Sequence, residues 1–143
     1  MRKGFTLVEL LIVIVIIGIL AAAMLLSSGS ATASATASAV ISDLRSLKAA
    51  CLMAWADSMD YYQTAAPQIG EVSKFMDNAD KVNNGKYSIV TSGGKWYVQY
   101  NAASDTPEVR EKLQGKAGSV GLLASTTSGD TYAGGNNVIM IAR

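Results

Sequence analysis

The chain has 143 residues, half of them hydrophobic, which leaves room for one small domain beyond any membrane segment. Its 12 basic and 11 acidic side chains give a formal net charge of +1, so the overall charge does not indicate nucleic-acid binding. There is no histidine, the commonest general base and metal ligand, and the single cysteine, Cys51, excludes an intrachain disulfide.

The apolar residues are concentrated near the N-terminus. Residues 5–26 form a stretch of 22 residues whose only charged side chain is Glu9. A helix needs about 20 apolar residues to cross the hydrocarbon core of a bilayer. We therefore predict a transmembrane helix here, with Arg2 and Lys3 holding its start in the cytoplasm.

A secretory signal peptide is an alternative interpretation of this segment. Such a peptide has an apolar run of about 7–15 residues followed by a cleavage site between small residues, which Ala21-Ala22-Ala23 would mimic. The apolar run is too long for this interpretation, and small residues continue well past it. The residues before the apolar run favour a more specific signal.

These residues are Lys3-Gly4-Phe5-Thr6-Leu7-Val8-Glu9-Leu10-Leu11. Together with the aliphatic run that follows, they resemble the type IV prepilin N-terminus, which type IV pilins share with the pseudopilins of type II secretion systems. The resemblance implies that a prepilin peptidase removes residues 1–4 as a leader peptide by cleaving between Gly4 and Phe5. It also implies N-methylation of the new Phe5 amine, with the apolar segment kept in the mature protein. Gly4 has no side chain, so a peptidase can approach the backbone closely.

Glu9 is the most informative residue of the segment. A carboxylate inside an apolar membrane helix costs about 2.5–3.5 kcal/mol, so it needs a partner or access to water at the membrane surface. The freed Phe5 ammonium is a suitable partner, either from a neighbouring subunit or from the same helix, where it lies four residues away. A buried pair between subunits would fix the axial offset of their helices. We predict Phe5 and Glu9 as assembly residues.

Residues 27–39 consist of Ser, Ala, Thr and Gly, a composition typical of a flexible linker or of a helix with small side chains. We favour the helix, with Gly18 and Gly29 as its weak points; the proline that many family members carry near Leu26 is absent. Pro67 ends the predicted helix, which covers residues 5–66 and would be about 90 Å long. Its second half is amphipathic, because apolar side chains recur there at steps of three and four residues. These side chains are Val40, Leu44, Leu47, Cys51, Trp55, Met59 and Tyr62.

Residues 67–143 are predicted to form a globular head. Two β-rich runs at residues 86–91 and 95–100 flank Ser92-Gly93-Gly94 and predict a hairpin, and residues 138–141 predict a final strand. Residues 120–124 are ambiguous.

Two helices are also expected in this head. A short one covers residues 71–79 and directs Val72, Phe75 and Met76 inward. Another begins at Asp105-Thr106-Pro107-Glu108 and stops at Gly115. The predicted fold class is α+β: a long N-terminal α-helix, transmembrane in its first half, with a small antiparallel β-sheet head packed on its C-terminal half.

No motif in the chain predicts catalysis, a metal site or a cofactor. Residues 57–60 and 77–80 contain neighbouring carboxylates but lack the alternating oxygen ligands of a calcium loop. Gly93-Gly94-Lys95 lacks the glycine spacing of a P-loop. Cys51 is expected to be a buried apolar side chain, and Tyr61, Tyr62 and the aromatic residues 96–100 to be packing residues.

The predicted function is that of a structural subunit, not an enzyme, in a type IV pilus or pilus-like filament. The expected partners are copies of the same chain, the prepilin peptidase and the pilus assembly machinery. We expect a single-pass inner-membrane protein before assembly and a filament at the cell surface afterwards, in adhesion, motility or DNA uptake. A type II secretion pseudopilin and a single-span membrane protein with a ligand-binding head are the alternatives.

Overall fold

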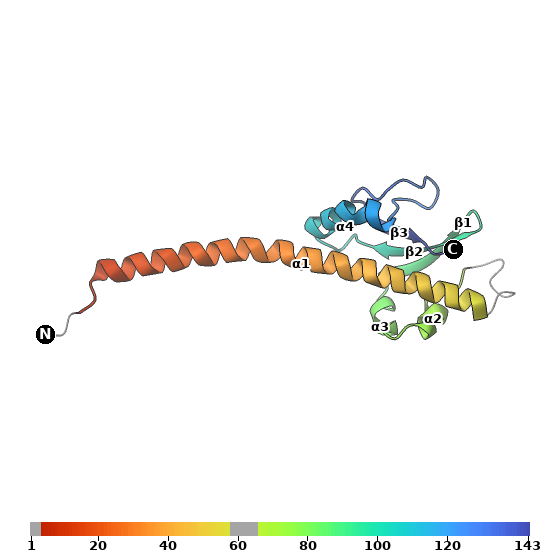
Figure 1. Cartoon of the computed structure of the whole chain (residues 1–143), viewed down its shortest axis with the longest axis horizontal. Coiled ribbons are helices and arrows are strands. Elements are labelled where there is room, and N and C mark those ends of the chain that lie inside the picture. Colours follow the sequence, from red (N-terminus) through yellow and green to blue (C-terminus); the bar gives the residue numbers. More distant parts are fainter. Residues whose placement is uncertain (1–3, 58–65) are drawn as a thin grey trace.

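The computed structural model describes residues 4–57 and 66–143. Its main feature is a long helix, α1 (Leu7–Asp57), whose N-terminal part projects from a small head (Figure 1). We call residues 7–25 the stem. The head consists of the second half of α1 and the elements that follow it. The predicted α+β class, with a long apolar N-terminal helix and a small antiparallel sheet, is confirmed.

Helix α1 is continuous over its 51 residues, so neither Gly18 nor Gly29 interrupts it. The linker interpretation of residues 27–39 is wrong, because all of them are helical. Hydroxyl groups in this part donate to the carbonyl four residues earlier, as from Thr36 to Thr32 at 3.0 Å and from Ser38 to Ser34 at 2.8 Å. These bonds satisfy the hydroxyls within the helix itself. Ala, the best helix former, occupies every second position of residues 31–39 and favours its continuation.

The second half of α1 forms the centre of the head. The predicted amphipathic stripe is confirmed there: Leu44, Leu47 and Cys51 are fully buried, and Val40 is 4% exposed. Burying one such aliphatic side chain contributes about 1.5–3 kcal/mol. Trp55 is half-buried, and Met59 and Tyr62 lie outside the described residues, as does most of the predicted continuation of the helix to residue 66.

The sheet has the order β1-β2-β3 and is antiparallel throughout, with β1 at Tyr87–Ser92, β2 at Lys95–Asn101 and β3 at Asn137–Ile141. The hairpin and the final strand are therefore confirmed. Gly93 and Gly94 have φ angles of 57° and 74°, the positive values that a tight two-residue hairpin turn requires. Residues Trp96, Val98 and Tyr100 alternate along β2 toward α1 and are buried.

Helix α4 (Pro107–Val120) packs against α1 beside the sheet. Its start agrees with the predicted signals, because Pro107 takes the first helical position after Thr106. The predicted stop at Gly115 is wrong. The helix instead continues to Gly121, whose left-handed conformation (φ 76°) ends it. The ambiguous residues 120–124 form this end and then a bridge from Leu123 to Ile139 beside β3.

A short segment covers the opposite side of α1 from the sheet and α4 (Figure 1). It contains α2 (Ile69–Val72), a 3-10 turn η2 (Ser73–Phe75) and α3 (Ala79–Val82), where the sequence predicted one helix over residues 71–79. Val72 is fully buried as predicted, but Phe75 is 38% exposed and so is not a core residue. The change to 3-10 geometry at Ser73 and the extended Met76 break the regular spacing on which that prediction depended.

Candidate functional site

The stem has no protein layer over it. Its large aliphatic side chains are between 49% exposed, at Val13, and 79% exposed, at Leu7. By length and composition, α1 is the one helix of the described chain that could cross a membrane, and none of its most apolar window is buried. A continuous apolar surface of this size is unfavourable in water, so the stem requires a bilayer or another protein.

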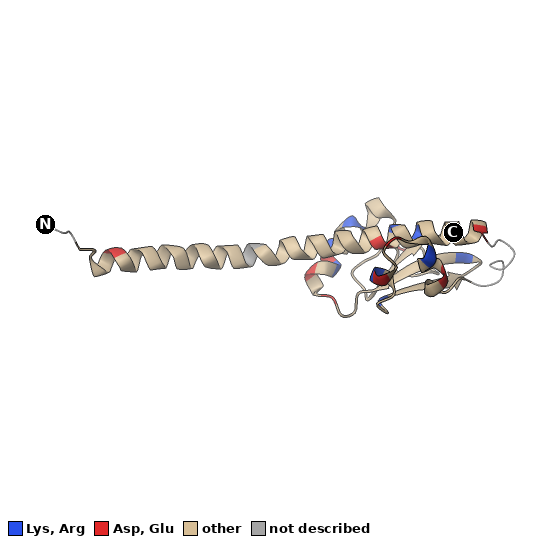
Figure 2. Ribbon diagram, turned by 90° about the horizontal axis from the view of Figure 1, so that it is seen from below, with Lys and Arg blue, Asp and Glu red and all other residues tan. Residues whose placement is uncertain are grey.

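A single charge interrupts the stem. Figure 2 shows it as one red segment near the N-terminal end of α1, where Glu9 lies. The Glu9 Oε2 atom accepts hydrogen bonds from the Thr6 amide at 2.9 Å and from the Thr6 hydroxyl at 2.7 Å. In return the Glu9 amide donates to the Thr6 hydroxyl at 3.2 Å. This reciprocal arrangement is a capping box, which satisfies orphan amides at the start of a helix.

Thr6 is a site residue that the sequence interpretation missed. The signal was present, since Thr6-Leu7-Val8-Glu9 has the T-x-x-E spacing of a capping box directly before an apolar run. The cost of a carboxylate inside a membrane and the pairing with Phe5 both leave the Thr6 cap unpredicted. The structure gives this carboxylate a partner within its own chain, Thr6. Phe5 has no free amine while residues 1–4 are attached, so its pairing with Glu9 stays a prediction.

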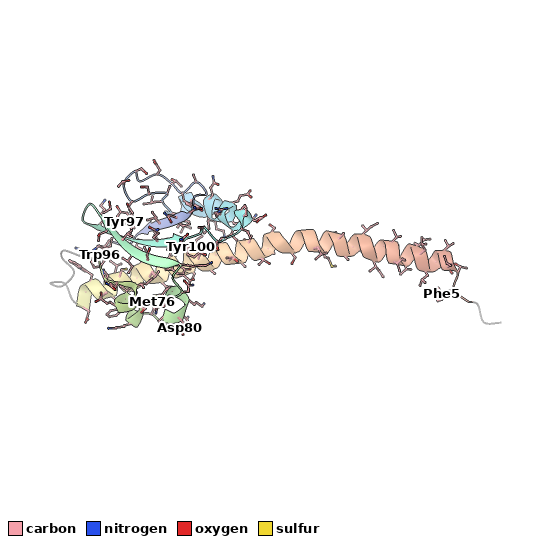
Figure 3. The ribbon with its side chains drawn as sticks, turned by 180° about the vertical axis from the view of Figure 1, so that it is seen from behind. Phe5, Met76, Asp80, Trp96, Tyr97 and Tyr100 are labelled. Atoms are coloured by element: carbon pink, nitrogen blue, oxygen red, sulfur yellow. The ribbon has the colours of Figure 1, made fainter. Side chains whose placement is uncertain are left out.

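The predicted processing residues lie directly before the helix. Gly4, Phe5 and Thr6 are non-helical and exposed, and Phe5, labelled in Figure 3 at the end of the stem, has 91% of its side chain exposed. A Cβ placed on Gly4 would meet no atom within 4 Å. An exposed, non-helical backbone is accessible to a peptidase. Residues 1–3 of the predicted leader lie outside the described part.

The head contains a second group of polar side chains, which joins the sheet to α1 and to the loop before α4. The Tyr87 hydroxyl donates to Asp43 of α1 at 2.9 Å, and the Tyr100 hydroxyl donates to Asp105 at 2.7 Å. Lys86 forms an ion pair with Asp105 at 3.2 Å. Burial, followed by the hydrogen bond to a carboxylate, raises the pKa of Tyr87 and of Tyr100 well above the usual value for a phenol. Both phenols therefore stay protonated donors.

This polar group links β1 and β2 to α1 and to the loop before α4. Within residues 4–57 and 66–143, no three His, Cys, Asp or Glu side chains are grouped to hold a metal ion. Of the two acidic runs considered for calcium, residues 58–60 lie outside the described part, and Asp77 and Asp80 form no such group. Cys51 is fully buried, and burial raises the pKa of its thiol to about 12, so it remains an unreactive thiol at neutral pH.

The fold and the site together define an α+β head on a long helix whose apolar stem can span a membrane. Comparison with known proteins adds one match: residues 1–25 fit the family model described as the prokaryotic N-terminal methylation motif. This motif is the type IV prepilin signature, so the resemblance predicted from the first residues is confirmed over that segment. No curated protein and no solved structure gave a significant match.

Proposed function

We propose that this chain is a structural subunit of a type IV pilus or pilus-like filament, with no catalytic activity of its own. The observation that carries the proposal is the start of α1. A capped carboxylate, Glu9, stands alone in a bare apolar stem and lies within the N-terminal methylation motif. Capping boxes also begin ordinary helices, so it is the combination of this cap with a bare apolar stem inside the methylation motif that favours a filament subunit.

Processing would begin with the prepilin peptidase, which cleaves after Gly4 and releases residues 1–4. Methylation of the Phe5 amine follows. Removal of Arg2 and Lys3 lowers the number of basic side chains from 12 to 10, against 11 acidic ones. A mature subunit near neutrality favours close packing of many copies, because its surface charges do not repel strongly.

Assembly would move the stem from one apolar environment to another. Before assembly, the stem spans the inner membrane once, with the head on the outer side. Afterwards, stems of neighbouring subunits cover one another, and repetition of one non-closing contact generates an open helical fibre at the cell surface. In the fibre, the Phe5 ammonium of one subunit pairs with Glu9 of another, so that neither charge is buried alone.

The mature N-terminus tests this proposal directly. Mass spectrometry should find a chain that begins with methylated Phe5; an intact Met1, or cleavage after Ala23, would contradict it. Electron microscopy of surface material then separates the filament types, because long fibres support a pilus and their absence favours a secretion pseudopilin.

The role of Glu9 has its own test. Glu9→Ala should insert into the membrane normally but lose nearly all fibres, because the amine of the neighbouring subunit would be left unpaired. Glu108→Ala removes an exposed acid from the head and is the matched control. Normal fibres from the Glu9 variant would refute the pairing role.

A further inference from the structure

The head half of α1 carries an apolar strip that stays exposed among the described residues of the head. Ala49, Leu52, Met53 and Ala56 are all exposed, Leu52 to 44% and Met53 to 53%. Their spacing of three and four residues puts them on one side of the helix. We call these four residues the distal strip. Large exposed apolar side chains gathered in one place mark a surface that another protein covers.

One basic residue stands at the stem-side end of this strip. Arg45 lies four residues before Ala49 and is exposed. Among the described residues the single ion pair joins Lys86 and Asp105, so Arg45 has no acidic partner within the part of the chain that the structure covers. The stem in turn carries one charge, the acidic Glu9. Lys116 of α4 lines the same hollow as Arg45, so the stem-side end of the distal strip is basic, whereas the corresponding end of the stem is acidic.

Their spacing along the helix also agrees. In a helical fibre, subunits are related by rotation about the fibre axis and translation along it, so long helices near that axis stay roughly parallel. Placing Glu9 of one copy level with Arg45 of another needs a shift of 36 residues, or about 54 Å along the helix. The same shift sets Val13, Ile16, Ile17 and Leu20 level with the distal strip. Because 36 residues make about ten full helical turns, the two faces meet when the copies are rotated by about half a turn relative to each other.

We infer that the distal strip and Arg45 form the docking surface for the stem of a second copy of this chain, with an ion pair between Glu9 and Arg45 fixing the register. Aliphatic contacts alone tolerate many shifts, whereas the paired charges select one. This inference rests on the proposed filament function.

The geometry of Glu9 leaves room for the pair. Both Thr6 donors bond to Oε2, and no donor among the described residues bonds to Oε1. A carboxylate has about four acceptor positions, so Glu9 can keep its cap and still accept from a guanidinium and from the Phe5 amine. The long side chain of Arg45 keeps part of its guanidinium hydrated beside the head, which limits the cost of burial.

The number of fibres formed by Arg45 variants tests whether the Arg45 charge pairs with Glu9. Removing one partner of a desolvated ion pair is costly, so Arg45→Ala should lower the number of fibres per cell by about tenfold or more, and Arg45→Glu should abolish them. Lys48→Ala, one turn further along α1, and Lys95→Ala, on the hairpin, should have little effect. Fluorescence of the two tryptophans, Trp55 and Trp96, checks that each head is folded. Equal losses for Lys48→Ala and Arg45→Ala would overturn the inferred register.

Disulfide trapping tests the contact itself. A chain with Val13→Cys and Ala49→Cys should form a ladder of linked subunits on oxidation of isolated fibres. A chain with Val13→Cys and Ser119→Cys, on the exposed side of α4, should not. Buried Cys51 is present in both and serves as background. Fibres with no ladder, or with unchanged yield in Arg45→Ala, would overturn this inference while leaving the filament function intact. If cells that express the unaltered chain form no fibres, the filament function itself would be refuted.

Discussion

Replacing Thr6 with valine tests whether the capping box fixes the start of α1. Valine keeps the shape of threonine but removes the hydroxyl, which donates to Glu9 Oε2 at 2.7 Å and accepts from the Glu9 amide at 3.2 Å. The bond from the Thr6 amide to Oε2 remains. Losing a threonine cap costs about 0.5–2 kcal/mol, and a value near 1 kcal/mol corresponds to roughly a fivefold change in an equilibrium. The first turn of α1 should therefore open about five times more often.

Amide hydrogen exchange measures this opening. The full chain in detergent micelles should show exchange about fivefold faster in Thr6→Val at the amides of Glu9 and Leu10, which bond to Thr6, with the rest of the stem unchanged. Thr6→Ser keeps the hydroxyl and should exchange like the unaltered chain. Thr32→Val removes a hydroxyl that bonds only to the Ser28 carbonyl, so it should not change the first turn. Unaltered exchange in Thr6→Val would show that the capping box does not hold this end.

Three further predictions concern the head. Leu44→Ala should lower the free energy of unfolding by about 2–5 kcal/mol in urea titrations followed by tryptophan fluorescence, because Leu44 is fully buried, whereas Leu52→Ala, at a site 44% exposed, should cost far less. The raised pKa of Tyr87 and Tyr100 means that the folded head keeps phenol protons which the unfolded chain loses near pH 10. The urea midpoint should be steady below about pH 10 and fall above it, and changing both residues to Phe should reduce that fall, leaving the part due to buried Tyr132, whose pKa is also raised. Cys51, with its pKa raised to about 12, should react with a maleimide at about pH 7 only after denaturation, and rapid reaction of the native head would contradict its burial.

Local signals in the sequence predicted the long helix and the sheet well. The hairpin was predictable because Gly93 and Gly94 supply the two positive φ angles that the turn needs, between two runs of β-forming residues. The stripe through Leu44 and Leu47 was predictable because one periodicity extends over several turns, and both side chains are fully buried. In each case the local preference and the tertiary packing agree.

The wrong predictions arose where packing decides between equivalent local signals. Both Gly115 and Gly121 are able to end a helix, but only Gly121 takes the left-handed conformation, where the chain turns toward β3. Phe75 was expected in the core because of its spacing from Val72, yet the backbone changes to 3-10 geometry between them. Thr6 is a different case, because the same carboxylate has two roles: Glu9 is costly inside a membrane and also caps the helix start through Thr6.

The uninterrupted course of α1 has a mechanical consequence. The stem and the buried stripe of the head belong to one continuous helix. A force applied along the stem is therefore transmitted directly to the packing contacts of Leu44 and Leu47. Backbone hydrogen bonds in a helix lie in series along its axis and yield one turn at a time, whereas the head resists as a packed unit. Under tension the stem should therefore unwind and lengthen first. The folded head should limit this extension.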